Sequence, residues 1–171
     1  MHNKTTKLVL IALLIALNII LVRFGAIYLG PAIRVSFGFI PIVIMGILFG
    51  PLFAACGAGI ADFIGAIVFP TGGAYFPGFT LSAILTGYIY GKMLYGKKLS
   101  IKRIVISNLL VIMIVQLFMN SIWLSLILNK AFVVLVTSKV IKSLLMLPIE
   151  SLMIFLTYKY ISPVLLKYAE H

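Results

Sequence analysis

Charged and amide side chains interrupt the apolar runs of this sequence, and these side chains are the ones that could do chemistry. Asp62 lies within one such run, and Asn120 and Trp123 lie three residues apart within another. Lys139 and Lys142 are also three residues apart, so on a helix each of these two pairs shares a face. A charge inside a lipid bilayer costs about 2.5–3.5 kcal/mol on insertion scales, so an embedded charge is a candidate functional residue. We therefore expect these residues to help bind a ligand.

The types of these side chains indicate what that ligand would be. Arg23 and Arg34 flank the segment after the first apolar run, and arginine binds a carboxylate through two parallel hydrogen bonds. Either Asp62 or the amide of Asn120 could pair with an amino-substituted heterocycle. Four aromatic residues offer flat faces for a ring system: Tyr75, Phe76, Phe79 and Trp123. Together the residues predict a planar, hydrogen-bonding ring joined to a carboxylate.

Each of these residues also has a purely structural explanation. The cations could extend toward lipid headgroups, and Asp62 could pair with one of them for packing alone. Trp123 could belong to an interfacial aromatic belt, Asn120 could join two helices, and the phenylalanines could be ordinary core residues. Such explanations do not account for the convergence of so many polar groups on one depth, which favours a pocket.

The composition indicates an integral membrane protein. Hydrophobic residues make up 63% of the 171 residues and charged residues only 10%, whereas soluble domains carry about 25% charged residues. This length fits a single transmembrane domain, residues 1–171. The net charge of +11 could suggest nucleic-acid binding. We exclude that partner because the basic residues lie mainly at the ends of the apolar segments and not along one solvated face.

Six apolar segments predict an all-α fold, a bundle of six transmembrane helices with structured outer loops. The predicted helices cover residues 8–22, 38–49, 52–69, 79–94, 104–128 and 138–160. Residues 70–78 are too rich in glycine and proline for a helix, so they are predicted to form a structured loop.

The distribution of lysine and arginine predicts the orientation of the chain. With the N-terminus in the cytoplasm, nine basic residues fall on the cytoplasmic side: Lys4, Lys7, Lys92, Lys97, Lys98, Lys102, Arg103, Lys159 and Lys167. Four fall on the outer side: Arg23, Arg34, Lys130 and Lys139. A multi-pass protein of the cell membrane with both termini in the cytoplasm is expected, and its polar cluster then lies near the outer face.

Several activities lack the residues that they need. The sequence has no Walker A motif, no His/Cys cluster for a metal and only three acidic residues, so we expect no cofactor, no metal and no ATP hydrolysis by this chain. An intramembrane enzyme using Asp62 and Glu150 is an alternative, disfavoured by their different depths and by the lack of a nucleophile. Glu150 follows Pro148, where it could satisfy backbone groups freed by a kink or pair with a lysine. A scaffold that binds no small molecule is a third possibility.

One further pattern suggests a protein partner. Ala12 and Ala16 are four residues apart in the first predicted helix and form a small-xxx-small patch, which allows two helices to approach closely. On its own this patch is a weak signal.

Taken together, these motifs resemble the substrate-binding S components of energy-coupling factor (ECF) vitamin transporters, and most closely their folate-specific branch. The resemblance rests on residues 34–41, 59–65, 69–80, 120–124 and 146–149, of which 69–80 is the most specific stretch. It implies a high-affinity folate-binding subunit, which is not an enzyme, with outer loops that gate the pocket. An S component for another vitamin, such as riboflavin or pantothenate, is the alternative.

The resemblance also implies partners and site residues. Ala12 and Ala16 would dock on a transmembrane coupling protein that joins two cytoplasmic ATPases, and the S component would topple in the bilayer to release its substrate. The expected substrate-binding residues are Arg23, Arg34, Ser36, Asp62, Tyr75, Phe76, Phe79, Asn120, Trp123, Lys139 and Lys142. Lys139 stands where the family is expected to have arginine in its final helix, and lysine lacks the forked geometry for a carboxylate.

Overall fold

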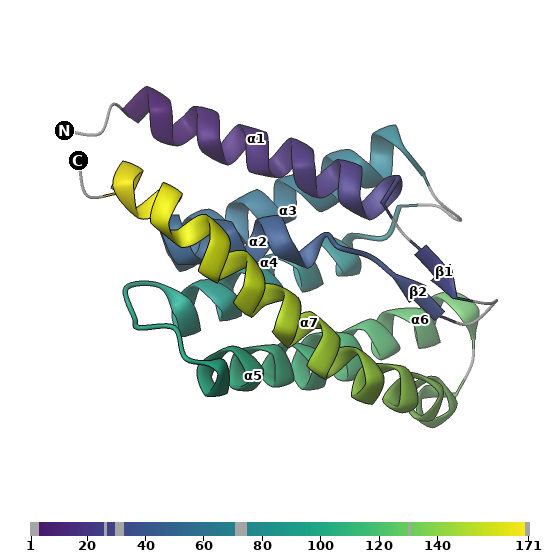
Figure 1. Cartoon of the computed structure of the whole chain (residues 1–171). Helices are drawn as coiled ribbons and strands as arrows, with labels where there is room; N and C mark the ends of the chain where they lie inside the picture. Colours follow the sequence, from purple (N-terminus) through teal and green to yellow (C-terminus); the bar gives the residue numbers. More distant parts are fainter. Residues whose placement is uncertain (1–3, 26, 30–32, 71–74, 130, 170–171) are drawn as a thin grey trace.

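The computed structural model describes residues 4–25, 27–29, 33–70, 75–129 and 131–169. Side chains are described for residues 4–25, 36–70, 75–129 and 131–160. Within these ranges the chain is a bundle of helices with one short β-hairpin (Figure 1).

The helices form six continuous rods, which overlap the six predicted segments. They are α1 (Lys4–Arg23), α2 (Phe39–Phe49), α3 (Pro51–Val68), α4 (Pro77–Leu94), the rod made of α5 (Ile101–Leu110), η1 (Val111–Met119) and α6 (Asn120–Leu128), and α7 (Phe132–Ala169). The expected helical architecture is therefore confirmed. Among the described residues, four helical segments are long and apolar enough to cross a bilayer: Lys4–Arg23, Pro51–Val68, Ile101–Leu128 and Phe132–Tyr160.

Glycine and proline set the boundary between α2 and α3. Gly50 has φ 87°, a conformation that residues with a side chain rarely adopt, and it ends α2. Pro51 is the first residue of α3, where its missing N–H costs no helical hydrogen bond. The two residues therefore reverse the chain in a single step.

A β-hairpin lies outside the helices that the sequence predicted. Strand β1 (Ile27–Leu29) pairs antiparallel with β2 (Ile33–Val35), with Ile27 opposite Val35. This hairpin follows α1, inside what was expected to be an outer loop.

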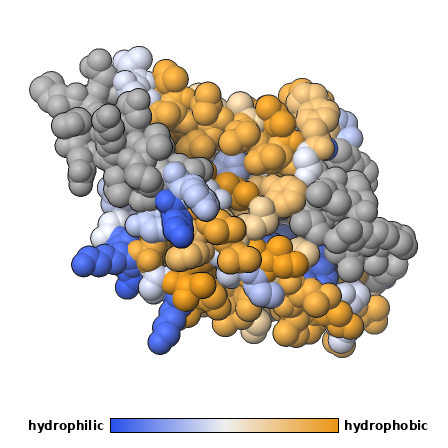
Figure 2. All heavy atoms as spheres, viewed as in Figure 1, coloured by the Kyte–Doolittle hydropathy of each residue, from blue (hydrophilic) through white to orange (hydrophobic). Residues whose placement is uncertain are grey.

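The rods alternate in direction between two ends of the bundle (Figure 1). We call the end that carries β1 and β2 the hairpin end, and the end where α1 begins and α7 finishes the terminus end. The connection between α4 and α5 also lies at the terminus end. Figure 2 shows hydrophobic residues over much of the visible surface, with many of the strongly hydrophilic ones toward the terminus end. This pattern suits a protein surrounded by lipid.

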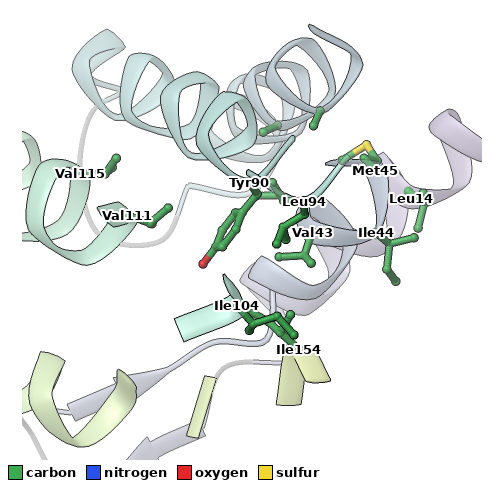
Figure 3. Close-up of a cluster of buried hydrophobic side chains, with 13 residues drawn as sticks. Leu14, Val43, Ile44, Met45, Tyr90, Leu94, Ile104, Val111, Val115 and Ile154 are labelled. Carbon is green, nitrogen blue, oxygen red and sulfur yellow. The ribbon is translucent and has the colours of Figure 1, made fainter. Parts of the chain in front are cut away.

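Helices α3 and α4 pack against each other at backbone distance. A Cβ atom on Gly87 would lie 2.3 Å from the carbonyl oxygen of Ala54, and one on Gly91 would lie 2.4 Å from the Cα of Pro51. Beside this contact lies the buried core, which includes Met45, fully buried, and Tyr90 (Figure 3). The glycine contact fixes α4 and therefore the side chains that α4 directs into the site.

Candidate functional site

A cavity of about 430 Å³ lies between α1, α2, α3, α4, the α5–α6 rod and α7. Seven of the eleven expected substrate-binding residues line it: Arg23, Ser36, Asp62, Phe79, Asn120, Lys139 and Lys142. Three do not: Tyr75, Phe76 and Trp123. The side chain of Arg34 lies outside the described residues, although its backbone belongs to β2. Five separate rods and the segment after the hairpin therefore bring sequence-distant polar residues to one cavity.

Tyr75 is joined to the cavity wall through Thr80. The Thr80 hydroxyl donates to Asp62 Oδ2 at 2.8 Å. Because that hydroxyl has a single proton, the Tyr75 hydroxyl must be the donor in its 3.0 Å bond to Thr80 Oγ1. The Tyr75 ring also packs edge-on against Phe63, with ring centroids 5.5 Å apart. These hydrogen bonds therefore connect Asp62 in the cavity wall to Tyr75 in the segment just before α4.

Two of the predicted aromatic residues lie behind the wall and support it. Trp123 Nε1 donates to Ser82 Oγ at 3.1 Å, and Ser82 lines the cavity. The Phe76 ring lies 5.8 Å from the Trp123 ring and 6.1 Å from that of Phe79, which lines the cavity. A Cβ atom on Gly78 would lie 2.6 Å from Trp123, so only glycine fits there. These aromatic residues act on the cavity through Ser82 and Phe79.

The amide of Asn120 carries a hydrogen-bond acceptor that the described residues of the cavity leave without a donor. Its Oδ1 atom is buried and accepts no hydrogen bond from the described residues. Its neighbour Ser121 is fully buried and accepts a hydrogen bond from Lys139 Nζ at 3.3 Å, which ties α7 to α6. A buried oxygen without a donor costs about 1–3 kcal/mol, so a ligand that donates to Asn120 would recover this free energy.

The α5–α6 rod has an unusual backbone beside the cavity. Residues Val111–Met119 form a π-helix, in which hydrogen bonds connect residues five apart. Val111, Val115 and Gln116 of this segment line the cavity, as does Asn120 just after it. Segments of this kind occur frequently at functional sites.

At the end of the cavity nearer the terminus end lies a polar network that the sequence reading did not identify. The Tyr90 hydroxyl donates to Asn108 Oδ1 at 2.9 Å, and Asn108 Nδ2 donates to Ser151 Oγ at 3.3 Å and to the Leu147 carbonyl at 3.4 Å. The side chain of Asn108 also hydrogen-bonds Glu150. Figure 3 shows the Tyr90 hydroxyl at the edge of the buried cluster, pointing away from Leu94. The network therefore joins α4, α5 and α7.

Other polar residues of the cavity were also missed. They are Asn18, Ser82, Thr86, Tyr90, Gln116 and Ser143. Glu150, which was weighed but not expected to bind the substrate, lines the cavity as well. Helical spacing contained a signal for part of this set, because Ser82, Thr86 and Tyr90 are four residues apart and share one face of α4. Asn18 is nearly fully buried, and its Nδ2 donates to the Gly38 carbonyl, which fixes the segment before α2 against α1.

Asp62 and Glu150, the pair considered for an intramembrane enzyme, both line the cavity. Each is engaged by its own partner, Thr80 and Asn108 respectively. Among the residues that the structure describes, no group of three or more His, Cys, Asp or Glu side chains could hold a metal ion. Ala12 and Ala16 are exposed on α1, away from the cavity-lining residues of that helix.

Comparison with known proteins identifies the family. Residues 6–158 match the family described as ECF transporter, substrate-specific component. The folate transporter FolT of Clostridium novyi (strain NT) is 40% identical over 159 residues, which cover 93% of this chain and 91% of that protein. The folate transporter FolT of Leuconostoc mesenteroides subsp. mesenteroides is 36% identical over 153 residues, covering 85% and 80% of the two chains. A crystal structure of FolT bound with folic acid superposes with a TM-score of 0.81 at 35% identity and covers 88% of this chain and 91% of that one. This chain therefore belongs to the substrate-specific components of ECF transporters.

Proposed function

We propose that this protein is the high-affinity folate-binding membrane subunit of an ECF-type vitamin uptake transporter. The observation that carries the proposal is the cavity itself, which combines cations, a buried acceptor and an aromatic support in a chain 40% identical to a folate transporter. Folate unites a planar, hydrogen-bonding ring with a carboxylate-bearing tail, so it would use each of these groups.

The proposed topology crosses the membrane six times as a single domain of residues 1–171, with the terminus end in the cytoplasm. The α4–α5 connection and the helix ends that it joins favour this orientation, because together they carry five basic residues: Lys92, Lys97, Lys98, Lys102 and Arg103. Helix α2 has 11 residues and is about 16 Å long, too short to cross a bilayer on its own. In this proposal α2 and the segment before it together form the second crossing, and the cavity opens outward at the hairpin end.

Within the cavity, we assign the folate carboxylates to the cations at the hairpin end, Arg23 and Lys139, with Arg34 of β2 as a further candidate. Ser36 and Phe79 would complete this end of the site. The remaining predicted aromatic residues would act indirectly, through the hydrogen bonds of Tyr75 and Trp123 and the ring contacts of Phe76.

The proposed partners are a transmembrane coupling protein and its two cytoplasmic ATPases. Ala12 and Ala16 supply the docking patch in this proposal, because small side chains exposed on α1 let a second helix approach closely. Energy for uptake would come from the ATPases, and this chain would capture the substrate.

Isothermal titration calorimetry with the purified protein in nanodiscs tests the substrate. Folate should bind, whereas riboflavin and pantothenate should give no heat of binding under the same conditions. Binding of either vitamin without binding of folate would refute the substrate assignment while leaving the family unchanged.

A further inference from the structure

The turn between α4 and α5 gathers five basic residues at the terminus end, far from the hairpin. Lys92 lies in the last turn of α4, Lys97 and Lys98 follow in the connection, and Lys102 and Arg103 lie in the first turn of α5. None of the three acidic residues of the sequence falls between positions 92 and 103. Figure 2 shows strongly hydrophilic residues that project from the terminus end beside a largely hydrophobic surface. We call these five residues the basic turn.

Hydrogen bonds to backbone carbonyls hold the basic turn together. Lys97 Nζ donates to the Lys92 carbonyl at 3.4 Å, and Arg103 Nη1 donates to the Lys98 carbonyl at 3.1 Å. Ser100 caps α5, because its hydroxyl oxygen accepts from the Arg103 backbone N–H at 3.4 Å. All of these partners are uncharged, and within the described residues no carboxylate pairs with a cation of the basic turn. Its positive charge is therefore available to an anionic partner.

The stability of α5 does not explain where its cations lie. Lys102 and Arg103 are in the first turn of the helix, where the helix dipole favours negative charge. The orientation of the chain in the bilayer depends on the number of basic residues in the connection and not on the helix face that each one occupies. The face that Lys102 occupies therefore needs another explanation.

Lys102 shares its face of α5 with exposed apolar residues. Ile106 and Leu109 follow it at four and seven residues, which is the helical spacing of a single face. Lys102 is exposed, and the side chains of Ile106 and Leu109 are 51% and 45% exposed, whereas Ile104 and Ser107 on the other side of the helix are buried. This face thus begins with a cation at the terminus end and continues as an apolar surface along the helix. An amphiphile with an anionic head and an apolar chain matches both parts.

We propose that the basic turn and this face of α5 bind an anionic phospholipid, with the headgroup phosphate at Lys98 and Lys102 and an acyl chain along the apolar residues that follow. The inference goes beyond folate binding, and it rests on the proposed function only in placing the terminus end at the membrane surface. Clusters of four to eight basic residues next to a transmembrane helix typically recognise anionic headgroups. An acidic protein surface would satisfy the cations alone, whereas a lipid also covers the exposed apolar residues.

Native mass spectrometry of the detergent-purified protein tests the site, with dioleoyl phosphatidylglycerol and dioleoyl phosphatidylcholine added in equal amounts. Each lysine near a membrane surface strengthens the binding of an anionic lipid about 5-fold. The wild-type protein should therefore retain phosphatidylglycerol as its first bound lipid with a preference of roughly 10- to 30-fold. The double variant Lys98→Gln/Lys102→Gln should lower this preference by about 5-fold or more.

Two further double variants are the controls. Lys4→Gln/Lys159→Gln removes two exposed cations from the same end of the bundle but outside the basic turn, so it should keep the wild-type preference. Lys98→Arg/Lys102→Arg retains the charge and should keep the preference as well. The melting temperature of each variant without added lipid should equal that of wild type, because all of the substituted side chains are exposed. Glycerol phosphate, the soluble headgroup without acyl chains, should not displace phosphatidylglycerol at tenfold molar excess.

The outcomes decide between the possible partners. Equal retention of the two lipids by wild type, or an equal loss of preference in the two charge-matched glutamine pairs, would overturn the site. Displacement of the lipid by glycerol phosphate would also overturn it, since the ligand would then be a soluble anion. If wild type shows no lipid preference and Lys98→Gln/Lys102→Gln no longer pulls down the coupling protein, an acidic protein surface is the partner instead. Absence of folate binding in calorimetry would overturn the proposed function and leave these lipid measurements unaffected.

Discussion

Thr80→Val tests whether the hydrogen bonds of Tyr75 help to retain the ligand. The substitution keeps the shape of the side chain and removes the hydroxyl that connects Tyr75 to Asp62. The bond to the partly buried Asp62 carboxylate contributes about 1.5 kcal/mol, and the exposed bond to Tyr75 contributes about 0.5 kcal/mol. Together they contribute about 2 kcal/mol, which corresponds to an approximately 30-fold change in a rate or an equilibrium constant.

We expect this loss to appear mainly in ligand dissociation. Without the hydroxyl, Tyr75 keeps its ring contact with Phe63 but loses its hydrogen-bonded connection to Asp62, so the hairpin end of the cavity should open more often. Folate should then dissociate up to about 30-fold faster from Thr80→Val, with a much smaller change in the association rate. The chain has a single tryptophan, Trp123, which is hydrogen-bonded to the cavity residue Ser82, so stopped-flow quenching of its fluorescence reports binding directly.

Two further variants make the interpretation specific. Thr80→Ser keeps the hydroxyl and should dissociate folate at nearly the wild-type rate. Tyr75→Phe removes only the outer bond and should raise the dissociation rate about 2-fold, with no further effect in the Thr80→Val background. A wild-type dissociation rate in Thr80→Val, or equal rates in Thr80→Val and Thr80→Ser, would show that these bonds do not retain the ligand.

Four other substitutions test separate parts of the molecule. Arg23→Met should weaken the binding of folate about 10-fold more than that of pteroate, the analogue without the glutamate tail, in calorimetry. Equal losses for the two ligands would refute a role for Arg23 in binding the glutamate tail. Asn120→Leu removes a buried oxygen that accepts no hydrogen bond from any residue that the structure describes, so the empty protein should be as stable as wild type or about 1 kcal/mol more stable, while folate affinity falls about 10-fold. A rise in affinity would contradict this reading. Ala12→Trp should block pull-down of the coupling protein and leave folate affinity unchanged, whereas normal assembly would argue against docking at this patch. Gly87→Val should lower the free energy of unfolding by more than 2 kcal/mol, because even its Cβ would lie 2.3 Å from the Ala54 carbonyl oxygen, and a wild-type melting temperature would show that α3 and α4 can move apart.

The six rods could be predicted from the sequence because long apolar runs have few alternatives in a membrane. The boundary of α7 was less predictable. The helix begins at Phe132, whereas the prediction began it at residue 138. The prediction began late because the β-branched run before Ser138 does not resemble a helix start by composition. The hairpin and the π-helical segment Val111–Met119 had no periodic signal, since a three-residue strand is too short for one and a π-turn depends on packing.

The depth of these residues along their helices could also be predicted, but whether each side chain points into the cavity could not. Counting residues along each run places Tyr75, Phe76 and Trp123 at the level of the hairpin end of the cavity, yet in the structure none of the three lines the cavity. The direction in which a side chain points depends on how the neighbouring helices fix the rotation of its own helix about the helix axis. For Trp123 the deciding contact is Gly78, which gives the indole the space to lie against α4.

Glu150 shows why a proline can mislead a sequence reading. Pro148 lacks an N–H, so the carbonyl four residues earlier, that of Leu144, loses its helical donor. What the proline releases is thus an acceptor, and a carboxylate is itself an acceptor, so Glu150 cannot repair that loss. Helix α7 continues through Pro148, and the amide of Asn108 donates to the neighbouring Leu147 carbonyl. With backbone repair excluded for the carboxylate, pairing with a lysine is the other structural explanation, and Lys142, eight residues earlier on the cavity-lining part of α7, interacts electrostatically with Glu150.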